Sequence, residues 1–95
     1  MTILEENITA NATGTEFAFA GGKANVTANG VYDGGKLSLE YSRPSTAVGA
    51  DVFTLVNKKF YTDFGYNIEL PACNLRWVME DAGSGVDVDA FVEDF

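Results

Sequence analysis

Apolar and polar residues alternate along most of this chain, and no segment shows the spacing of an amphipathic helix. The residues between the apolar positions are mostly Asn, Thr, Ser, Glu and Asp. The pattern predicts antiparallel strands that bury one face in a core and expose the other to water. The apolar positions are Phe17 and Phe19; Ala24, Val26 and Ala28; Leu37, Leu39 and Tyr41; Tyr66, Ile68 and Leu70; Leu75, Trp77 and Met79; and Val86, Val88 and Val92.

Turn-forming residues divide the alternation into strands. Gly21-Gly22 and Asp33-Gly34-Gly35 suit hairpin turns, because glycine adopts positive φ without steric cost, and Asn57-Lys58 is a weaker connection. The longest internal loop is expected from Ser42 to Gly49, around Pro44. The expected strands cover residues 15–20, 23–32, 36–42, 51–56, 59–64, 66–70, 73–79 and 86–94.

The length of 95 residues is that of one domain with one modest core. We expect an all-β fold, a single-domain antiparallel β-sandwich of the jelly-roll or Ig-like kind with about seven or eight strands. Residues 1–14 are expected to form a polar N-terminal arm or an edge strand, and residues 15–95 the sandwich.

Composition argues against several locations and partners. The longest apolar run is far shorter than a membrane span, and Met1 to Asn7 carry acids where a signal peptide would carry lysines. The formal net charge of −8 disfavours binding to nucleic acid, because phosphates would be repelled. Cys73 is the only cysteine and continues the alternation toward Leu75 and Trp77, so we expect a buried thiol.

The sequence argues against an enzyme. It contains no histidine, which removes the commonest general base and the usual nucleophile and zinc arrangements. The segment from Gly30 to Gly35 lacks the lysine and hydroxyl of a phosphate-binding loop. Glu40 and Glu69 are nominal acid–base candidates, but both alternate with core positions and should face water. No catalytic residue, cofactor or metal is therefore expected.

Two surface features are candidate interaction sites. Asp87 and Asp89 belong to an acidic C-terminal region and alternate with buried valines, which favours a solvated face; a docking surface for a basic partner and a calcium site are the alternatives. Val31, Val78 and Phe91 fall opposite their core-facing neighbours, and if exposed together they would form an apolar interface patch. Most other aromatic residues are expected in the core.

Three segments carry a resemblance: NGVYDGGKLSLEYS, FGYNIELPACNLRW and AGSGVDVDAFV. The run from about Asn29 to the end, roughly two-thirds of the chain, in which these segments lie, resembles a group of small β-rich virion proteins of tailed bacteriophages. The resemblance implies a non-enzymatic component of the virion, a capsid decoration or cement protein whose partner is the major capsid protein or another virion protein, with homo-oligomers as a further possibility. The alternatives are a tail or head-to-tail accessory protein, and a carbohydrate- or protein-binding module that uses the Ser42 to Gly49 loop and exposed aromatic residues.

Overall fold

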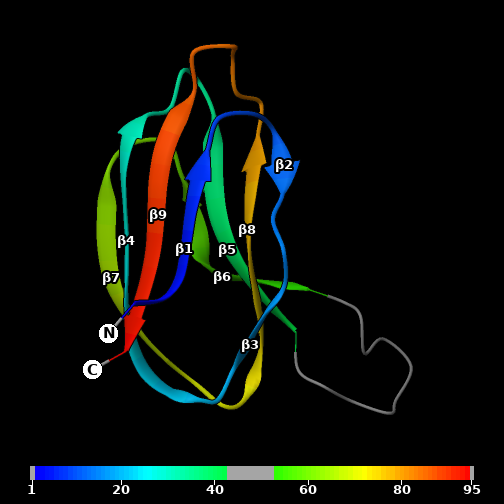
Figure 1. Cartoon of the computed structure of the whole chain (residues 1–95), viewed down its shortest axis with the longest axis vertical. Helices are drawn as coiled ribbons and strands as arrows, with labels where there is room; N and C mark the ends of the chain where they lie inside the picture. Colours follow the sequence, from blue (N-terminus) through cyan, green and yellow to red (C-terminus); the bar gives the residue numbers. More distant parts are fainter. Residues whose placement is uncertain (1, 43–52, 95) are drawn as a thin grey trace.

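A computed structural model describes residues 2–42 and 53–94, which form nine strands in two antiparallel sheets (Figure 1). The strands are β1 (Thr2–Ile8), β2 (Ala12–Thr13), β3 (Phe17–Phe19), β4 (Gly22–Val31), β5 (Lys36–Ser42), β6 (Thr54–Phe60), β7 (Phe64–Leu70), β8 (Cys73–Glu80) and β9 (Asp87–Asp94). The described part of the chain has no helix, so it contains none that could span a membrane.

The first sheet has the order β1-β9-β4-β7 and the second the order β2-β8-β5-β6, with β3 also paired to β8. The expected all-β, two-sheet antiparallel fold is therefore confirmed. The segment Thr2–Ile8 is an edge strand paired with β9, which is the second of the two forms expected for the N-terminal region.

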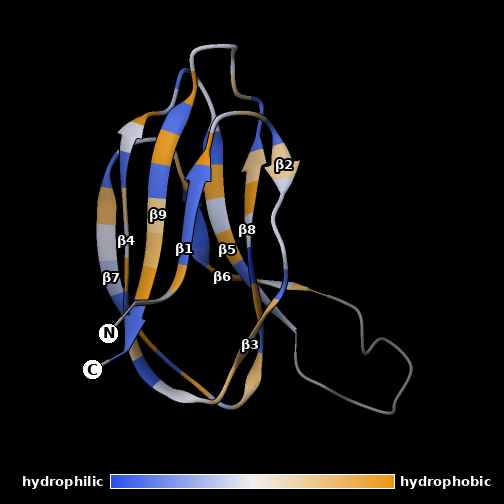
Figure 2. Cartoon of the chain, viewed as in Figure 1, coloured by the Kyte–Doolittle hydropathy of each residue, from blue (hydrophilic) through white to orange (hydrophobic). Residues whose placement is uncertain are grey.

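Alternation determines which side chains enter the core between the sheets. Figure 2 shows the alternating bands of polar and apolar residues along β9. The first sheet contributes small residues such as Ala24, Ala28 and Ala90, whereas the second contributes the largest side chain, Trp77, which is 1% exposed. Small residues facing large ones let the two layers interdigitate at the density of a protein interior. The expected burial of Cys73 is confirmed as well.

The expected hairpins are wrong, although the turns themselves form. Asp33 and Gly34 have positive φ values of 46° and 79°, as in a type I′ turn, and Gly35 N–H donates to the Tyr32 carbonyl at 2.7 Å. However, β4 belongs to the first sheet and β5 to the second, so this turn crosses between sheets. The Gly21-Gly22 turn between β3 and β4 also crosses. Turn residues specify local backbone shape, while strand pairing depends on distant parts of the chain.

The boundary expected at Asn57-Lys58 is also wrong. Asn57 has a φ of 70° but lies inside β6, where the register against β5 is irregular, so it forms a bulge rather than a turn. Residues 61–63, expected within a strand, instead connect β6 to β7. The expected loop from Ser42 to Gly49 lies, apart from Ser42, outside the described residues, as does the start of the strand expected at 51–56.

Candidate binding pocket

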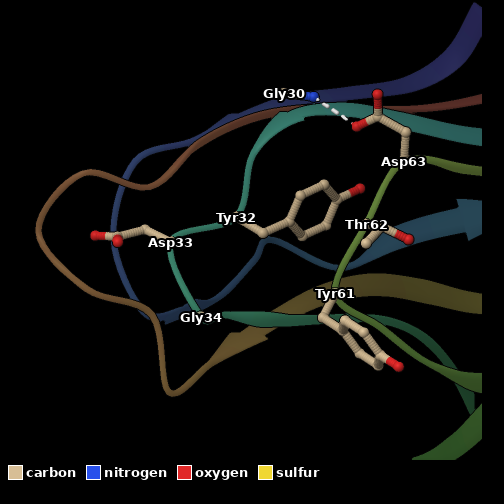
Figure 3. A pocket seen from close by; sticks show the side chains of 7 residues that line it. All are labelled: Gly30, Tyr32, Asp33, Gly34, Tyr61, Thr62 and Asp63. Atoms are coloured by element: carbon tan, nitrogen blue, oxygen red, sulfur yellow. Dashed lines mark hydrogen bonds between the residues drawn. The ribbon is translucent and has the colours of Figure 1, made fainter.

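A pocket of about 490 Å³ opens at the end of the sandwich where β4 turns into β5 and β6 turns into β7. Gly30 and residues 32–34 line one side, and residues 61–63 line the other (Figure 3). The two turns meet through one hydrogen bond, in which Gly30 N–H donates to Asp63 Oδ1 at 3.0 Å. The pocket therefore lies between segments that are about thirty residues apart in the chain but fixed to each other.

The β4–β5 turn is held by the loop between β8 and β9. The Asp33 carboxylate accepts the Gly85 N–H at 2.8 Å, and the Asp33 carbonyl accepts the Gly83 N–H at 2.9 Å. Figure 3 shows the Asp33 side chain pointing away from Tyr32 and toward this loop. Asp33 is thus a structural residue of the turn, and its carboxylate is directed away from the interior of the pocket.

The β6–β7 connection is held by aromatic stacking. The rings of Phe60 and Phe64 flank the connection and stack with centroids 3.9 Å apart. Phe64 also lies against Trp77 of the second sheet, with ring centroids 6.4 Å apart. Since both ends of the connection are anchored, the three residues between them occupy a defined position at the mouth of the pocket. Tyr61 is 69% exposed there.

Tyr32 is the buried polar residue of the pocket. Its side chain is only 6% exposed and points toward the 61–63 turn (Figure 3). The hydroxyl makes no hydrogen bond to any described residue. Burial, and next the negative charge of Asp63, raise the pKa of Tyr32 to about 12. The phenol is therefore neutral at physiological pH, able both to donate and to accept a hydrogen bond.

The lining of this pocket offers groups that can bind a polar ligand. Asp63 is the one carboxylate of the lining that lies on the side of Tyr32, and it is hydrogen-bonded to backbone. Within residues 2–42 and 53–94, no group of three or more acidic or cysteine side chains is arranged to hold a metal ion. An exposed ring, a buried phenol, the Thr62 hydroxyl and a carboxylate together suit a polar or cationic ligand.

Three of the five residues singled out from the sequence lie at or near this end. Val31 follows Gly30 directly, is 59% exposed, and pairs in register with Asp87 on β9. Asp87 and Asp89 are exposed on the outer face of the first sheet, where the Asn7 side-chain amide donates to a carboxylate oxygen of each at 2.8 Å. This amide offsets part of the repulsion between the two carboxylates.

The apolar patch considered from the sequence does not form. Val31 and Phe91 lie on the first sheet, whereas Val78 lies on β8 of the second. Phe91 and Val78 are both half-buried. The three side chains alternate correctly with their core neighbours, but alternation within each strand carries no information about which sheet the strand joins.

The outer face of the second sheet has its own polar contacts. Arg76 forms an ion pair with Glu40 at 2.9 Å and lies over the Phe53 ring at 3.7 Å from its centroid. Glu69 is exposed on β7, and its Oε2 lies 4.0 Å from the Nζ of Lys23. The two glutamates considered as acid–base candidates thus lie on different sheets, as members of separate ion pairs.

Sequence reasoning missed the pocket because it placed Tyr61 inside a strand. The one local signal was the polar pair Thr62-Asp63 between aromatic residues, a weaker turn signal than glycine or proline. Tyr32 was grouped with the other core aromatics, and its burial confirms that grouping.

Fold and pocket together define a two-sheet β-sandwich with a polar pocket at one end. No protein-family model, curated protein or solved structure matches the chain. Its function must therefore be argued from the residues of the chain.

Proposed function

We propose that this chain is a non-enzymatic structural protein of a tailed-bacteriophage particle, a capsid decoration protein that binds the particle through the pocket end of the sandwich. The observation that carries the docking role is that the two exposed large hydrophobic residues of the described chain, Tyr61 and Val31, both lie at this end. Exposed tyrosine beside charged residues is typical of protein interfaces.

The particle itself is proposed from the sequence resemblance. The segments that carry it correspond to β5, β7, β8 and β9 with the turns beside them. Those strands supply core residues of both sheets, so the resemblance involves strands of both sheets and not one hairpin. The proposed partner is the major capsid protein or another virion protein, and several weak contacts or an oligomer of this chain would then supply tight attachment.

Purified particles provide the test. We expect quantitative electrophoresis to find the protein at a fixed ratio to the capsid subunit, and labelled antibody to place it on the capsid rather than the tail. Tail labelling would favour the tail or head-to-tail accessory role. Absence from purified particles would refute the proposal.

A variant comparison tests the docking end. Tyr61→Ala removes a ring that is 69% exposed, so it should weaken binding to particles at least about tenfold while leaving folding intact. Glu69→Gln, an exposed site on β7, is the control and should bind normally. Equal binding by both variants would show that another surface is used.

A second candidate is a carbohydrate-binding module, favoured by the same exposed ring. Tyr61 lies beside Thr62 and Asp63, so a sugar could stack on the ring and hydrogen-bond to the two polar side chains. A soluble glycan that binds the pure protein, and is lost with Tyr61→Ala, would support this role over decoration.

A further inference from the structure

We propose that the pocket between the 30–34 and 61–63 turns receives a basic side chain, the guanidinium of arginine or the ammonium of lysine, from the protein partner. This inference rests on the proposed function for the identity of the partner as a protein. It deepens that proposal by naming the chemical group recognised and the residues that recognise it.

Charge is the first argument. The pocket lining includes two acidic residues and no basic residue, although only the carboxylate of Asp63 lies on the Tyr32 side while that of Asp33 is directed toward the β8–β9 loop. The nearest strands add Asp87 beside Val31, and the whole chain has 14 acids against six bases. Lys36 and Lys59, on strands that enter and leave this end, are paired with Asp81 and Glu80 at 3.5 Å and 2.8 Å. The field at the pocket therefore favours a cation.

The hydroxyl of Tyr32 is the second and independent argument. A buried polar atom without a partner costs stability, so such atoms are uncommon and often mark a functional site. This hydroxyl lies on the pocket side, faces the 61–63 turn, and makes no hydrogen bond to a described residue. An N–H of a bound cation would supply the missing partner.

The geometry of the pocket is complementary to a basic side chain. Asp63 uses Oδ1 for the Gly30 N–H, which fixes the carboxylate and leaves Oδ2 for a ligand. The exposed ring of Tyr61 adds a surface on which a planar guanidinium can lie. The Tyr32 hydroxyl is closed to solvent, so the cation reaches it through a small movement of the Thr62 side chain or the turn that carries it.

The test is a titration of the isolated protein with N-acetyl-arginine amide, followed by NMR of the backbone amides. We expect saturable shifts of the Gly30 and Thr62 amides with a dissociation constant on the order of millimolar, appropriate to a single side chain. N-acetyl-lysine amide should bind the same site, and the relative affinities identify the preferred cation. N-acetyl-citrulline amide keeps the shape of arginine without its charge and should bind at least about fivefold more weakly.

Variants separate a recognition role from a structural one. Asp63→Asn retains an oxygen that can accept the Gly30 N–H, so it should preserve the fold while weakening arginine binding about fivefold or more. Tyr32→Phe removes only the unpartnered hydroxyl, so it should leave the melting temperature unchanged or raised while weakening binding. Glu93→Gln makes the same charge change at the far end of β9 and should bind like the wild type.

Three results would overturn the inference: no saturable shift with either basic amide, equal binding of the citrulline compound, or unchanged binding by Asp63→Asn. A monosaccharide that shifts the same amides more strongly than arginine would reassign the pocket to sugars. Because this titration uses the isolated protein, its outcome is independent of whether the protein occurs on particles. Particles that carry the protein alongside a failed titration would refute the pocket assignment and leave decoration in place.

Discussion

At the scale of single residues, Trp77 contributes most to the core. It is the largest of the fully buried side chains and lies against Phe64 of the opposite sheet. Trp77→Ala should lower the free energy of unfolding by about 3–5 kcal/mol, because the cavity cannot close between two anchored sheets. Chemical denaturation followed by circular dichroism measures this loss. Tyr61→Ala, at an exposed site, should change stability by less than about 0.5 kcal/mol, and an equal effect of both variants would contradict the core assignment.

Two tyrosines should make the fold sensitive to alkaline pH. Burial raises the pKa of Tyr66 from 10.0 to about 12, and burial with the charge of Asp63 does the same for Tyr32. Because the unfolded chain loses these protons first, the contribution to stability is complete below pH 10 and is lost as the pH rises toward 12. Each tyrosine should contribute a slope of up to about 1.4 kcal/mol per pH unit in this window.

Denaturation at successive alkaline pH values measures that slope, and the variants Tyr66→Phe and Tyr32→Phe identify its source. Each variant should reduce the slope of the unfolding free energy against pH by the contribution of the tyrosine that it replaces. The two variants should differ in stability at neutral pH, because only one of the hydroxyls has a hydrogen-bond partner. The Tyr66 hydroxyl donates to the Val56 carbonyl at 3.4 Å, whereas the Tyr32 hydroxyl makes no hydrogen bond to the described residues. If stability falls with pH as steeply in both phenylalanine variants as in the wild type, the alkaline sensitivity belongs to other groups.

At the scale of strands, two glycines of β4 provide a matched pair. Both have positive φ, 109° at Gly22 and 141° at Gly30. A Cβ at Gly22 would meet nothing within 4 Å, whereas a Cβ at Gly30 would clash with the Asp87 carbonyl oxygen of β9. Gly22→Ala should therefore cost only about 1–2 kcal/mol of backbone strain, and Gly30→Ala about 1–3 kcal/mol more.

The same pair tests the connection between fold and pocket. The Gly30 N–H holds Asp63, so Gly30→Ala should also shift the NMR signals of residues 61–63, while Gly22→Ala should leave them in place. Thermal unfolding of both variants gives the stability difference. Equal losses would show that the close approach of β4 to β9 relaxes without cost.

The sequence predicted strands well where alternation and turn residues agree. The strand Lys36–Ser42 begins after Gly35 and has the bounds expected for it. At Asn57 the two signals conflict, and β6 continues through a residue with positive φ, because pairing with β5 outweighs the local preference for a turn. Strand existence is a local property of this chain, whereas strand continuity is set by a neighbouring strand.

The pocket could not be predicted by the same reasoning. It needs Tyr32 beside Asp63, a contact between the β4–β5 and β6–β7 connections. Alternation assigns each residue a face but does not show that β4 and β5 lie in different sheets. The exposure of Asp87 and Asp89 could be predicted from the sequence, because it depends only on alternation within one segment. Both carboxylates are exposed between the buried Val86, Val88 and Ala90.

At the scale of the whole molecule, net charge is the dominant property. A formal charge of −8 on 95 residues disfavours the compact state through self-repulsion, and a net charge of this size opposes association between copies. The paired carboxylates of Asp87 and Asp89 show how the fold accommodates this charge, since Asn7 donates to both from the neighbouring strand. Asparagine at either position would keep an oxygen for that amide while removing a charge.

The double variant Asp87→Asn with Asp89→Asn therefore tests whether this face is solvated or binds a ligand. For a solvated face, stability should change by less than about 0.5 kcal/mol, and sodium chloride should raise the melting temperature of the wild type more than that of the variant, because there is more repulsion to screen. For a calcium site, millimolar calcium would raise the wild-type melting temperature by several degrees beyond sodium chloride of matched ionic strength, and the variant would lose that excess. We expect the first result, since the structure places these carboxylates along one strand with an amide between them instead of around a common centre. A calcium-specific shift would contradict that interpretation and assign the face a metal.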